Sequence, residues 1–352
     1  MGEFILNRQP YLRMAVLAAS LFLSLEVTTS VTASPKTNYA TVEKTTVTEP
    51  YAYYVPKGKV LYTNSSLSKA KVTTSKYSKT TWYSKKTAII IKTSGNTQKK
   101  AHYAQITSAN GKHSYWTWNG NLKPITSAGF KIADKAAGSR FKKIKLAYMG
   151  DSIPHGWSGA VNYINSNYPT WMAKYLGISM TASQVPTNMA ISSGKILGSQ
   201  NRDMPQIMHR QDFKKYNMMT IQYGTNDYAH SEYSLKEVMT ELQKNITTIK
   251  SSNPKLKIYG ILPLSRFQKG SGEPADHIKM SGGYTFNQLK AAERKLYKKN
   301  HIAVIDFQKL DPNLITAANR KTTLRDHVLH PAAKTDQYLG HDAARFIEKN
   351  YK

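Results

Sequence analysis

The sequence contains no cysteine. This absence excludes disulfides, a thiol nucleophile and a cysteine-ligated metal. It does not exclude export, because a domain of sufficient size is stable without disulfides. The chain also lacks an HExxH motif, a histidine cluster and a phosphate-binding glycine loop, so we expect no metal and no nucleotide cofactor. Its 352 residues are enough for two domains.

Acidic residues are scarce. The chain has 21 Asp and Glu against 50 Lys and Arg, which gives a net charge of +29. Residues 50–133 contain neither Asp nor Glu, although lysine recurs throughout them. Such a charge attracts polyanions over a long range. Nucleic acid, an anionic membrane surface and an anionic cell wall are therefore the candidate partners.

Long apolar runs are also rare, and the one at the N-terminus is informative. Arg8 and Arg13 precede the run "MAVLAASLFLSL", and Val31 and Ala33 occupy the small positions of a cleavage site. This pattern predicts a signal peptide over residues 1–33, since the run is shorter than the ~20 residues that a membrane span needs. An uncleaved anchor is the alternative. We expect a secreted protein associated with the cell surface or cell wall, without a stable transmembrane span after cleavage. Nucleic acid is then not an expected partner.

Residues 34–50 are rich in Thr, Val and Ser and are interpreted as a linker. From 51 to 124, β-branched and aromatic residues alternate with small polar ones, as in "TTWYSKKTAIIIKT" and "AHYAQITSANGKHSYWTW". Period-two runs of this kind, bounded by Gly, Asn and Ser, predict strands. Asn110-Gly111 is a strong hairpin signal. We therefore predict a small all-β, SH3-like domain over residues 51–124.

This segment resembles the basic Tyr/Lys-rich attachment modules of surface proteins from lactobacilli and their relatives. The stretches "LYT", "KTTWY" and "SYWTWNGNLK" carry the likeness. A solvated spacer is the alternative, but spacers rarely carry tryptophans such as Trp82, Trp116 and Trp118. The resemblance implies that the module binds anionic cell-wall polymers.

After a second predicted linker, residues 125–141, the pattern changes to alternating strands and helices over 142–352. "KIKLAYMG" and "NMMTIQYG" are short apolar runs that end in glycine. "SLKEVMTELQKNITTIK" begins with a capping box, Ser234 and Glu237, and repeats its apolar residues at helical spacing. Alternating strands and helices predict a parallel sheet covered on both faces. Ligands bind such sheets beyond the carboxyl ends of the strands.

Three polar clusters follow predicted strands or lie in the last loop. They are Gly150-Asp151-Ser152, Gly224-Thr225-Asn226-Asp227 and the stretch "RDHVLHP", with Asp326, His327 and His330. Each alone could be an ordinary turn. Together they offer what acyl transfer needs: a hydroxyl nucleophile, a histidine base, an orienting carboxylate and donors for an oxyanion. Adjacent side chains of an extended chain point to opposite faces, which favours His330 over His327 as the partner of Asp326.

At these clusters the chain resembles the SGNH, or GDSL, family of serine esterases and lipases, over residues 142–352. The resemblance implies a flavodoxin-like three-layer α/β fold and no cofactor. It makes Ser152 the nucleophile and His330 the base, with Asp326 as its partner. It makes the Ser152 amide, a Gly194 amide and the Asn226 side chain the oxyanion donors. Two spacings depart from the family pattern. Gly194 lies one residue too far along its block, and three residues rather than two separate Asp326 from His330.

We therefore expect a secreted cell-surface serine ester hydrolase without a cofactor. Its substrate is expected to be an acylated carbohydrate or another small ester, most plausibly short-chain O-acyl groups on envelope or plant polysaccharides, because no long apolar lid is present. Two alternatives stay open. One is a wall-binding adhesin with a vestigial hydrolase domain, and the other is a lipid esterase.

Overall fold

The computed structural model describes residues 38–351, with gaps at 70–71, 78, 128, 133, 137–139, 158, 160–161 and 182–183. The predicted signal peptide, residues 1–33, lies outside the described residues. Residues Asn38–Lys352 form one compact unit. Within the described part of the chain, no helix is both long enough and apolar enough to cross a membrane.

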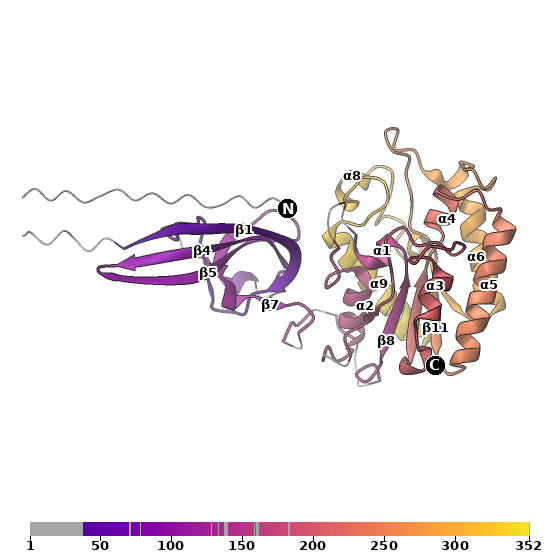
Figure 1. Ribbon diagram of the computed structural model, residues 1–352, viewed down its shortest axis with the longest axis horizontal. Helices are drawn as coiled ribbons and strands as arrows, with labels where there is room; N and C mark the ends of the chain where they lie inside the picture. Colours follow the sequence, from indigo (N-terminus) through magenta and orange to yellow (C-terminus); the bar gives the residue numbers. More distant parts are fainter. Residues whose placement is uncertain are drawn as a thin grey trace, which may run out of the picture. The chain divides into compact units, whose positions relative to one another are not determined.

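The N-terminal part is an antiparallel sheet with strand order β6-β5-β4-β1-β7 (Figure 1). Its strands are β1 (Tyr39–Tyr54), β4 (Trp82–Ser94), β5 (Thr97–Ser108), β6 (Ser114–Trp118) and β7 (Lys123–Pro124). A separate pair is formed by β2 (Val60–Leu61) and β3 (Val72–Thr73). The predicted hairpin joins β5 to β6, with Gly111 in the left-handed region at φ 72°. The prediction of a small all-β part before the α/β domain agrees with this sheet.

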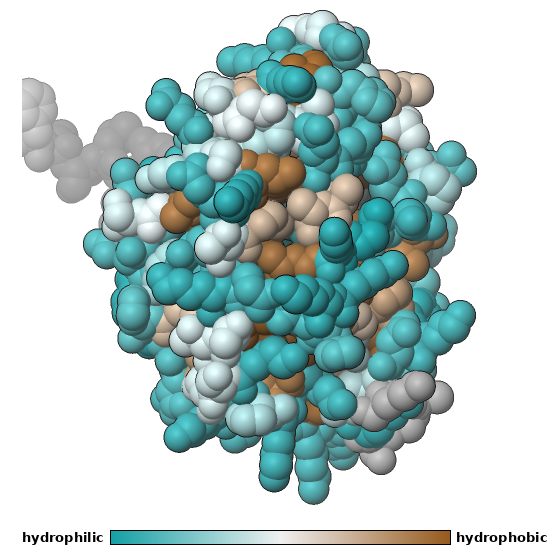
Figure 2. Space-filling view, turned by 90° about the vertical axis from the view of Figure 1, so that its right-hand side faces the viewer, coloured by the Kyte–Doolittle hydropathy of each residue, from teal (hydrophilic) through white to brown (hydrophobic). Residues whose placement is uncertain are grey.

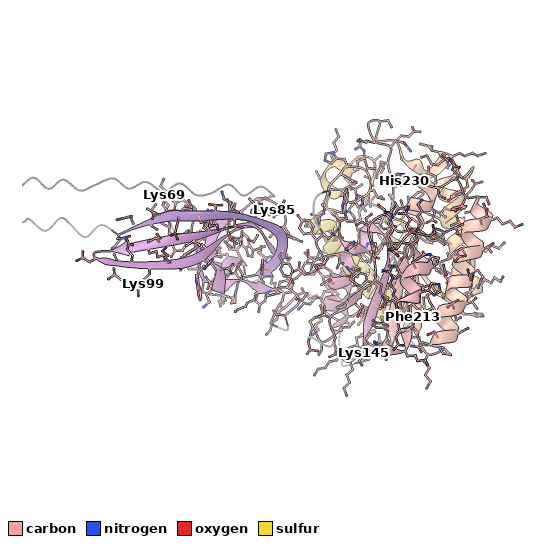
Figure 3. The ribbon with its side chains drawn as sticks, in the orientation of Figure 1. Lys69, Lys85, Lys99, Lys145, Phe213 and His230 are labelled. Atoms are coloured by element: carbon pink, nitrogen blue, oxygen red, sulfur yellow. The ribbon has the colours of Figure 1, made fainter. Side chains whose placement is uncertain are left out.

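Strand β1 begins earlier than the sequence suggested. It starts at Tyr39, inside the segment 34–50 interpreted as a linker, and Tyr39 pairs with Thr93 of β4. The Thr- and Val-rich composition of this segment suits an exposed strand as well as it suits a linker. Several lysines of this N-terminal part are exposed, among them Lys85 of β4, Lys99 of β5 and Lys69, which lies between β2 and β3 (Figure 3).

The C-terminal part is built on a parallel sheet with strand order β12-β11-β10-β8-β9. Its strands are β8 (Leu146–Gly150), β9 (Thr187–Asn188), β10 (Met218–Gln222), β11 (Lys257–Ile261) and β12 (Ala303–Ile305). The short apolar runs predicted as strands are buried along their whole length in β8 and β10. The prediction of an α/β domain with a parallel sheet is confirmed.

Helices cover both faces of this sheet (Figure 1). The helices of the described residues are α1 (Ser152–His155), α2 (Tyr168–Leu176), α3 (Met204–His209), α4 (Thr225–Ala229), α5 (Leu235–Ser252), α6 (Phe286–Lys299), α7 (Phe307–Leu310), α8 (Arg320–Thr323) and α9 (Ala333–Asn350). Because successive side chains of a strand alternate between faces, Leu146 and Met218 pack with α2 and α9. Ala147 and Met219 pack with α3, α5 and α6 on the other face.

Helix α5 shows how the sequence sets an element. Ser234 and Glu237 form the predicted capping box, each accepting a hydrogen bond from the other's backbone N–H. The apolar side of the helix then faces the sheet through Val238, Leu242 and Ile246, which are fully buried. Figure 2 looks onto the side of the molecule that carries α5 and α6, and its surface is largely hydrophilic, with hydrophobic side chains visible between the polar ones.

Candidate active site

The three polar clusters meet at the carboxyl end of the parallel sheet. Ser152 is the first residue of α1, and Asp151 alone separates it from the end of β8. Asn226 lies in α4, which begins just after β10. Asp326 and His330 lie in the loop between α8 and α9. The fold therefore brings together side chains up to 178 positions apart in the sequence.

A continuous hydrogen-bond chain joins three of these side chains. The Ser152 Oγ lies 2.8 Å from the His330 Nε2. The His330 Nδ1 lies 2.6 Å from the Asp326 Oδ2. Ser152 and His330 are buried, at 7% and 9% exposure. The hydroxyl, the imidazole and the carboxylate thus stand in the order that proton transfer from a serine nucleophile requires.

The extra residue between Asp326 and His330 is accommodated by a tight turn around the carboxylate. The Asp326 Oδ1 accepts backbone hydrogen bonds from Val328 at 3.0 Å, Leu329 at 2.9 Å and His330 at 3.0 Å. His327 adopts φ 62°, and this left-handed backbone lets the chain double back. The side chain of His327 is exposed, and no hydrogen bond joins it to Ser152 within the described residues. His330 is therefore the histidine that the fold places at the serine.

The same turn determines the charge of Asp326. Burial alone would raise the pKa of this carboxyl group. Three kinds of interaction lower it: the hydrogen bond from the His330 side chain, the backbone N–H groups of Leu329 and His330, and the charge of the nearby imidazole. Together they outweigh burial and hold the pKa of Asp326 well below its usual range. Asp326 is thus a carboxylate at any pH near neutrality and can orient the imidazole.

Two further contacts stabilise the position of His330 and of the turn that carries it. The ring of Trp157 lies against the His330 ring, with a centroid distance of 4.2 Å. The Phe267 N–H, in the segment after β11, donates to the Val328 carbonyl at 3.0 Å. The turn that carries His330 is therefore held from two other parts of the chain.

Asn226 and Gly194 also meet, but through other atoms than the sequence suggested. The Asn226 Nδ2 donates to the Gly194 carbonyl at 3.0 Å, which leaves its second N–H free of that bond. The Gly194 N–H donates to the Ile191 carbonyl at 3.0 Å. A Cβ at position 194 would come within 2.7 Å of the Arg202 carbonyl, so only glycine fits there. The Ser152 N–H stands at the first position of α1, where the helix itself offers it no acceptor.

The family model of the GDSL-like lipase/acylhydrolase family matches residues 148–338, which is more than half of the chain. The chain belongs to this family. The match includes Ser152, Asn226, Asp326 and His330. The acylhydrolase domain thus accounts for the parallel sheet and all three polar clusters.

The chain is also similar to solved structures. One structure covers 59% of this chain and 97% of its own, with 16% identity and a TM-score of 0.50. A protein from Lactobacillus plantarum covers 60% and 99%, with 14% identity and a TM-score of 0.48. An acetyl xylan esterase covers 56% and 97%, with 22% identity and a TM-score of 0.43. No curated protein sequence matches the chain.

Three carboxyl groups are buried near the polar clusters: Asp151, Asp227 and Glu293. Asp151 caps α1 by accepting from the Ile153 N–H at 2.9 Å, and burial raises its pKa to about 7. Asp227 accepts from the N–H groups of Ile196 at 2.9 Å and Leu197 at 3.0 Å, and burial raises its pKa to about 6. These two groups hold backbone segments in place through those hydrogen bonds.

The third carboxyl group, Glu293 of α6, is fully buried, and within the described residues neither of its oxygens has a hydrogen-bond partner. It occupies the space where a Cβ on Gly224 would stand. Gly224 adopts φ 105° there, a conformation that glycine tolerates best. Sequence reasoning did not single out Glu293 or the contact of Trp157 with His330, because both depend on tertiary packing between distant segments.

Proposed function

We propose that this protein is a serine ester hydrolase in which Ser152 is the nucleophile, His330 the general base and Asp326 the group that orients it. The observation that carries the proposal is the hydrogen-bond chain from the Ser152 Oγ through His330 to Asp326, with distances of 2.8 Å and 2.6 Å. Membership of the acylhydrolase family supports the same reaction class.

In the proposed acylation step, the Ser152 Oγ attacks the ester carbonyl carbon while the His330 Nε2 takes the hydroxyl proton. The Asp326 carboxylate stabilises the imidazolium that forms. The bond to the alcohol oxygen then breaks, and His330 gives its proton to that oxygen. In the second step a water molecule attacks the acyl-enzyme, with His330 again taking a proton and returning it to Ser152.

The oxyanion needs donors in place before the reaction, and each is worth ~3 kcal/mol of the barrier. We assign this role to the Ser152 N–H and to the second N–H of Asn226. The Gly194 amide, the third donor expected from the sequence, would have to exchange its 3.0 Å bond to the Ile191 carbonyl for a bond to substrate. Gly194 also acts through its carbonyl, which orients the Asn226 side chain.

For the substrate we propose short-chain O-acyl groups on an envelope or plant polysaccharide. Three features support this choice: the signal-peptide pattern at residues 1–33, the charge of +29, and the absence from the sequence of a long apolar lid. The basic sheet is proposed to hold the secreted enzyme on anionic cell-wall polymers. Trp157, partly exposed beside His330, offers an aromatic surface on which a sugar ring can rest.

The decisive experiment measures hydrolysis of p-nitrophenyl acetate and of acetylated polysaccharides by the wild-type protein and by Ser152→Ala. We expect turnover that Ser152→Ala abolishes. A wild type without any Ser152-dependent turnover on these substrates would identify the protein as a wall-binding adhesin instead. A series of acyl chain lengths tests the lipid alternative. Activity that peaks above about eight carbons would indicate burial of a long chain and would contradict the short-acyl proposal.

A further inference from the structure

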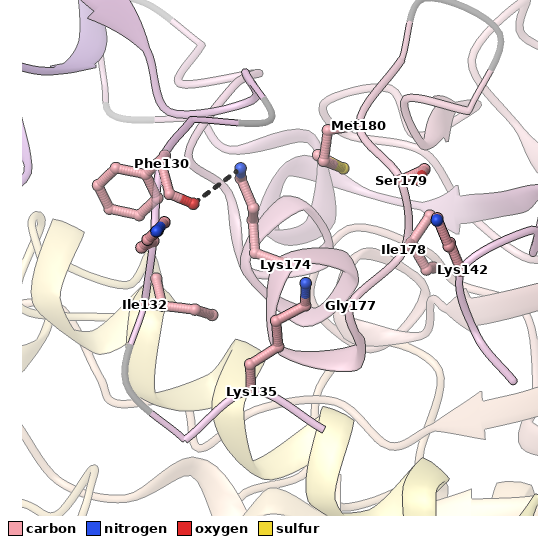
Figure 4. A pocket seen from close by; sticks show the side chains of 10 residues that line it. Phe130, Ile132, Lys135, Lys142, Lys174, Gly177, Ile178, Ser179 and Met180 are labelled. Carbon is pink, nitrogen blue, oxygen red and sulfur yellow. Dashed lines mark hydrogen bonds between the residues drawn. The ribbon is translucent and has the colours of Figure 1, made fainter. Parts of the chain in front are cut away.

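A cavity of about 530 Å³ lies beside the C-terminal end of α2 (Figure 4). None of its lining residues belongs to the proposed catalytic site. Four of them are lysines: Lys131, Lys135, Lys142 and Lys174. Lys131 and Lys135 come from the segment 125–141, which the sequence presented as a linker. This segment is in fact packed onto the acylhydrolase domain, since Phe130 and Phe141 are buried in the same core as α2.

Lys174 is unusual because its side chain is nearly buried, with 6% of the residue exposed. Its ammonium group donates to the Ser127 carbonyl at 2.7 Å and to the Phe130 carbonyl at 3.5 Å (Figure 4 shows the Phe130 bond). Burial, and next the charge of Lys135, lowers the pKa of Lys174 to about 8. Two carbonyls accept from at most two of its three N–H groups, and they supply no counter-charge for a buried ammonium.

The other three lysines are exposed and add to the same field. Lys135 passes close to the helix end: a Cβ on Gly177, which adopts φ 75°, would lie 2.7 Å from the Lys135 Cε. Among the described residues, no ion pair joins any of the four lysines to a carboxylate. Asp134, next to Lys135 in the sequence, pairs instead with His341 and Arg345 of α9. The C-terminal end of α2 contributes about half a negative charge, which offsets only a fraction of the four positive ones.

The remaining lining is apolar and comes from Phe130, Ile132, Ile178 and Met180. The volume falls in the range of about 300–1,000 Å³ that is typical of small-molecule sites, and it exceeds what a bare inorganic ion fills. Lysine binds phosphate as a point charge. We propose that this cavity is a binding site for an organic phosphate, with the phosphoryl group on the lysines and the carbon skeleton against the apolar residues.

The phosphate can belong to a phosphodiester polymer or to a small phosphorylated molecule. Isothermal titration calorimetry of the purified full chain separates these sources, with glycerol 3-phosphate, poly(glycerol phosphate) and, as the chemistry control, glycerol with acetate. Binding of the monomer identifies a small-molecule site. Binding of the polymer alone identifies a site for a phosphodiester chain. Binding of the monomer supports the proposal. Binding of the polymer supports it only where substitution of the cavity lysines weakens that binding, because the basic sheet is itself proposed to bind polyanions. Equal binding of acetate, or no binding of either phosphate, overturns it.

Variants locate the site. The double substitution Lys135→Gln/Lys142→Gln removes two exposed charges without disturbing the core, and we expect at least about tenfold weaker phosphate binding, the loss typical of removed charge-assisted contacts. Lys174→Met removes the buried charge at nearly constant volume and should have the same effect. Lys255→Gln/Lys309→Gln, which removes the same two charges at exposed lysines outside the cavity, is the matched control. If the control weakens binding as much as the Lys135→Gln/Lys142→Gln variant does, binding reflects overall charge and the cavity proposal is wrong.

This site is independent of ester hydrolysis. Ser152→Ala should bind phosphate with unchanged affinity, and the Lys135→Gln/Lys142→Gln variant should hydrolyse p-nitrophenyl acetate at the wild-type rate, which also verifies its fold. Failure of the ester assay would therefore leave the phosphate result intact, and failure of phosphate binding would leave the catalytic proposal intact.

Discussion

At the residue scale, the two histidines of the stretch "RDHVLHP" have different tasks. His330 contacts Ser152 at 2.8 Å, whereas His327 is exposed and serves the turn through its φ of 62°. We expect His330→Ala to lower kcat by at least about a thousandfold, as loss of a catalytic base does. His327→Ala, the matched control, should retain most of the activity. Kinetics on p-nitrophenyl acetate measure both. Full activity of His330→Ala would refute the assignment of the base.

Asp326 provides a second test at this scale. Its Oδ2 orients His330, and its Oδ1 accepts three backbone N–H groups. Asp326→Asn keeps the size of the side chain but places an NH₂ group where an acceptor is needed. We expect kcat to fall by up to about 10⁴-fold, because the wrong imidazole tautomer then faces the serine. Circular dichroism serves as the fold control. Near-wild-type kcat in a folded Asp326→Asn protein would remove Asp326 from the mechanism.

Polar clusters at the ends of apolar runs are visible in a sequence, and the structure brings these clusters together; the catalytic roles of their residues stay a prediction. How they meet was not. The turn that absorbs the extra residue before His330 depends on a left-handed backbone at a histidine, which no local pattern marks. The use of the Gly194 carbonyl to hold Asn226 depends on the packing of two loops. Both are tertiary effects.

At the scale of elements, the spacing of apolar residues and the capping box predicted helix α5, and the structure contains that helix with the capping box formed. The prediction of which residues are buried was weakest in segments without a helical or strand-like spacing of apolar residues. Phe130 and Phe141 lie in an irregular segment, yet both are buried in the core that includes α2: the Phe130 ring contacts Trp171, and the Phe141 ring contacts Tyr351. The first half of β1 posed the opposite difficulty, because its small polar composition is shared by exposed strands and by linkers.

The packing of α6 against the loop after β10 leads to a prediction about pH. Glu293 of α6 is buried beneath Gly224, and burial, with next the nearby Asp227 and Asp151, raises its pKa well above the usual value. The folded state therefore holds a proton that the unfolded state releases at lower pH. The protonated Glu293 therefore contributes to the free energy of unfolding. This contribution is fully present below about pH 4.3, the pKa of Glu in the unfolded chain, and is lost as the pH rises toward the higher pKa of the folded state.

Glu293→Gln keeps the volume and removes the ionisation. We expect its denaturation midpoint, measured in urea at pH 5 and pH 8, to change less between the two pH values than that of the wild type. The advantage of the variant should thus grow with pH. Glu241→Gln, at a partly exposed position on α5, is the control and should follow the wild type. A wild type and a Glu293→Gln protein with parallel pH profiles would show that Glu293 ionises freely.

At the scale of the whole molecule, the charge is unevenly distributed. Residues 50–133 contain no Asp or Glu. In the antiparallel sheet, acidic residues that could neutralise the lysines therefore occur only in β1. Within the described part of that sheet, the ion pair between Lys100 and Glu43 of β1 is an exposed one. Exposed charges of one sign attract an extended polyanion but are screened by salt, with a Debye length of about 10 Å at 0.1 M and about 3 Å at 1 M.

The proposed attachment to cell walls can therefore be tested without deleting the sheet, whose first strand begins at Tyr39 rather than near residue 51. We expect the triple variant Lys69→Gln/Lys85→Gln/Lys99→Gln to sediment less with purified cell walls than the wild type, and to be released at lower salt. Lys255→Gln/Lys309→Gln/Lys321→Gln removes the same charge from exposed positions of the acylhydrolase domain and is the control. Equal loss in both variants would mean that net charge alone drives attachment, and binding that persists at 1 M salt would mean that contacts other than exposed charges hold the protein to the wall.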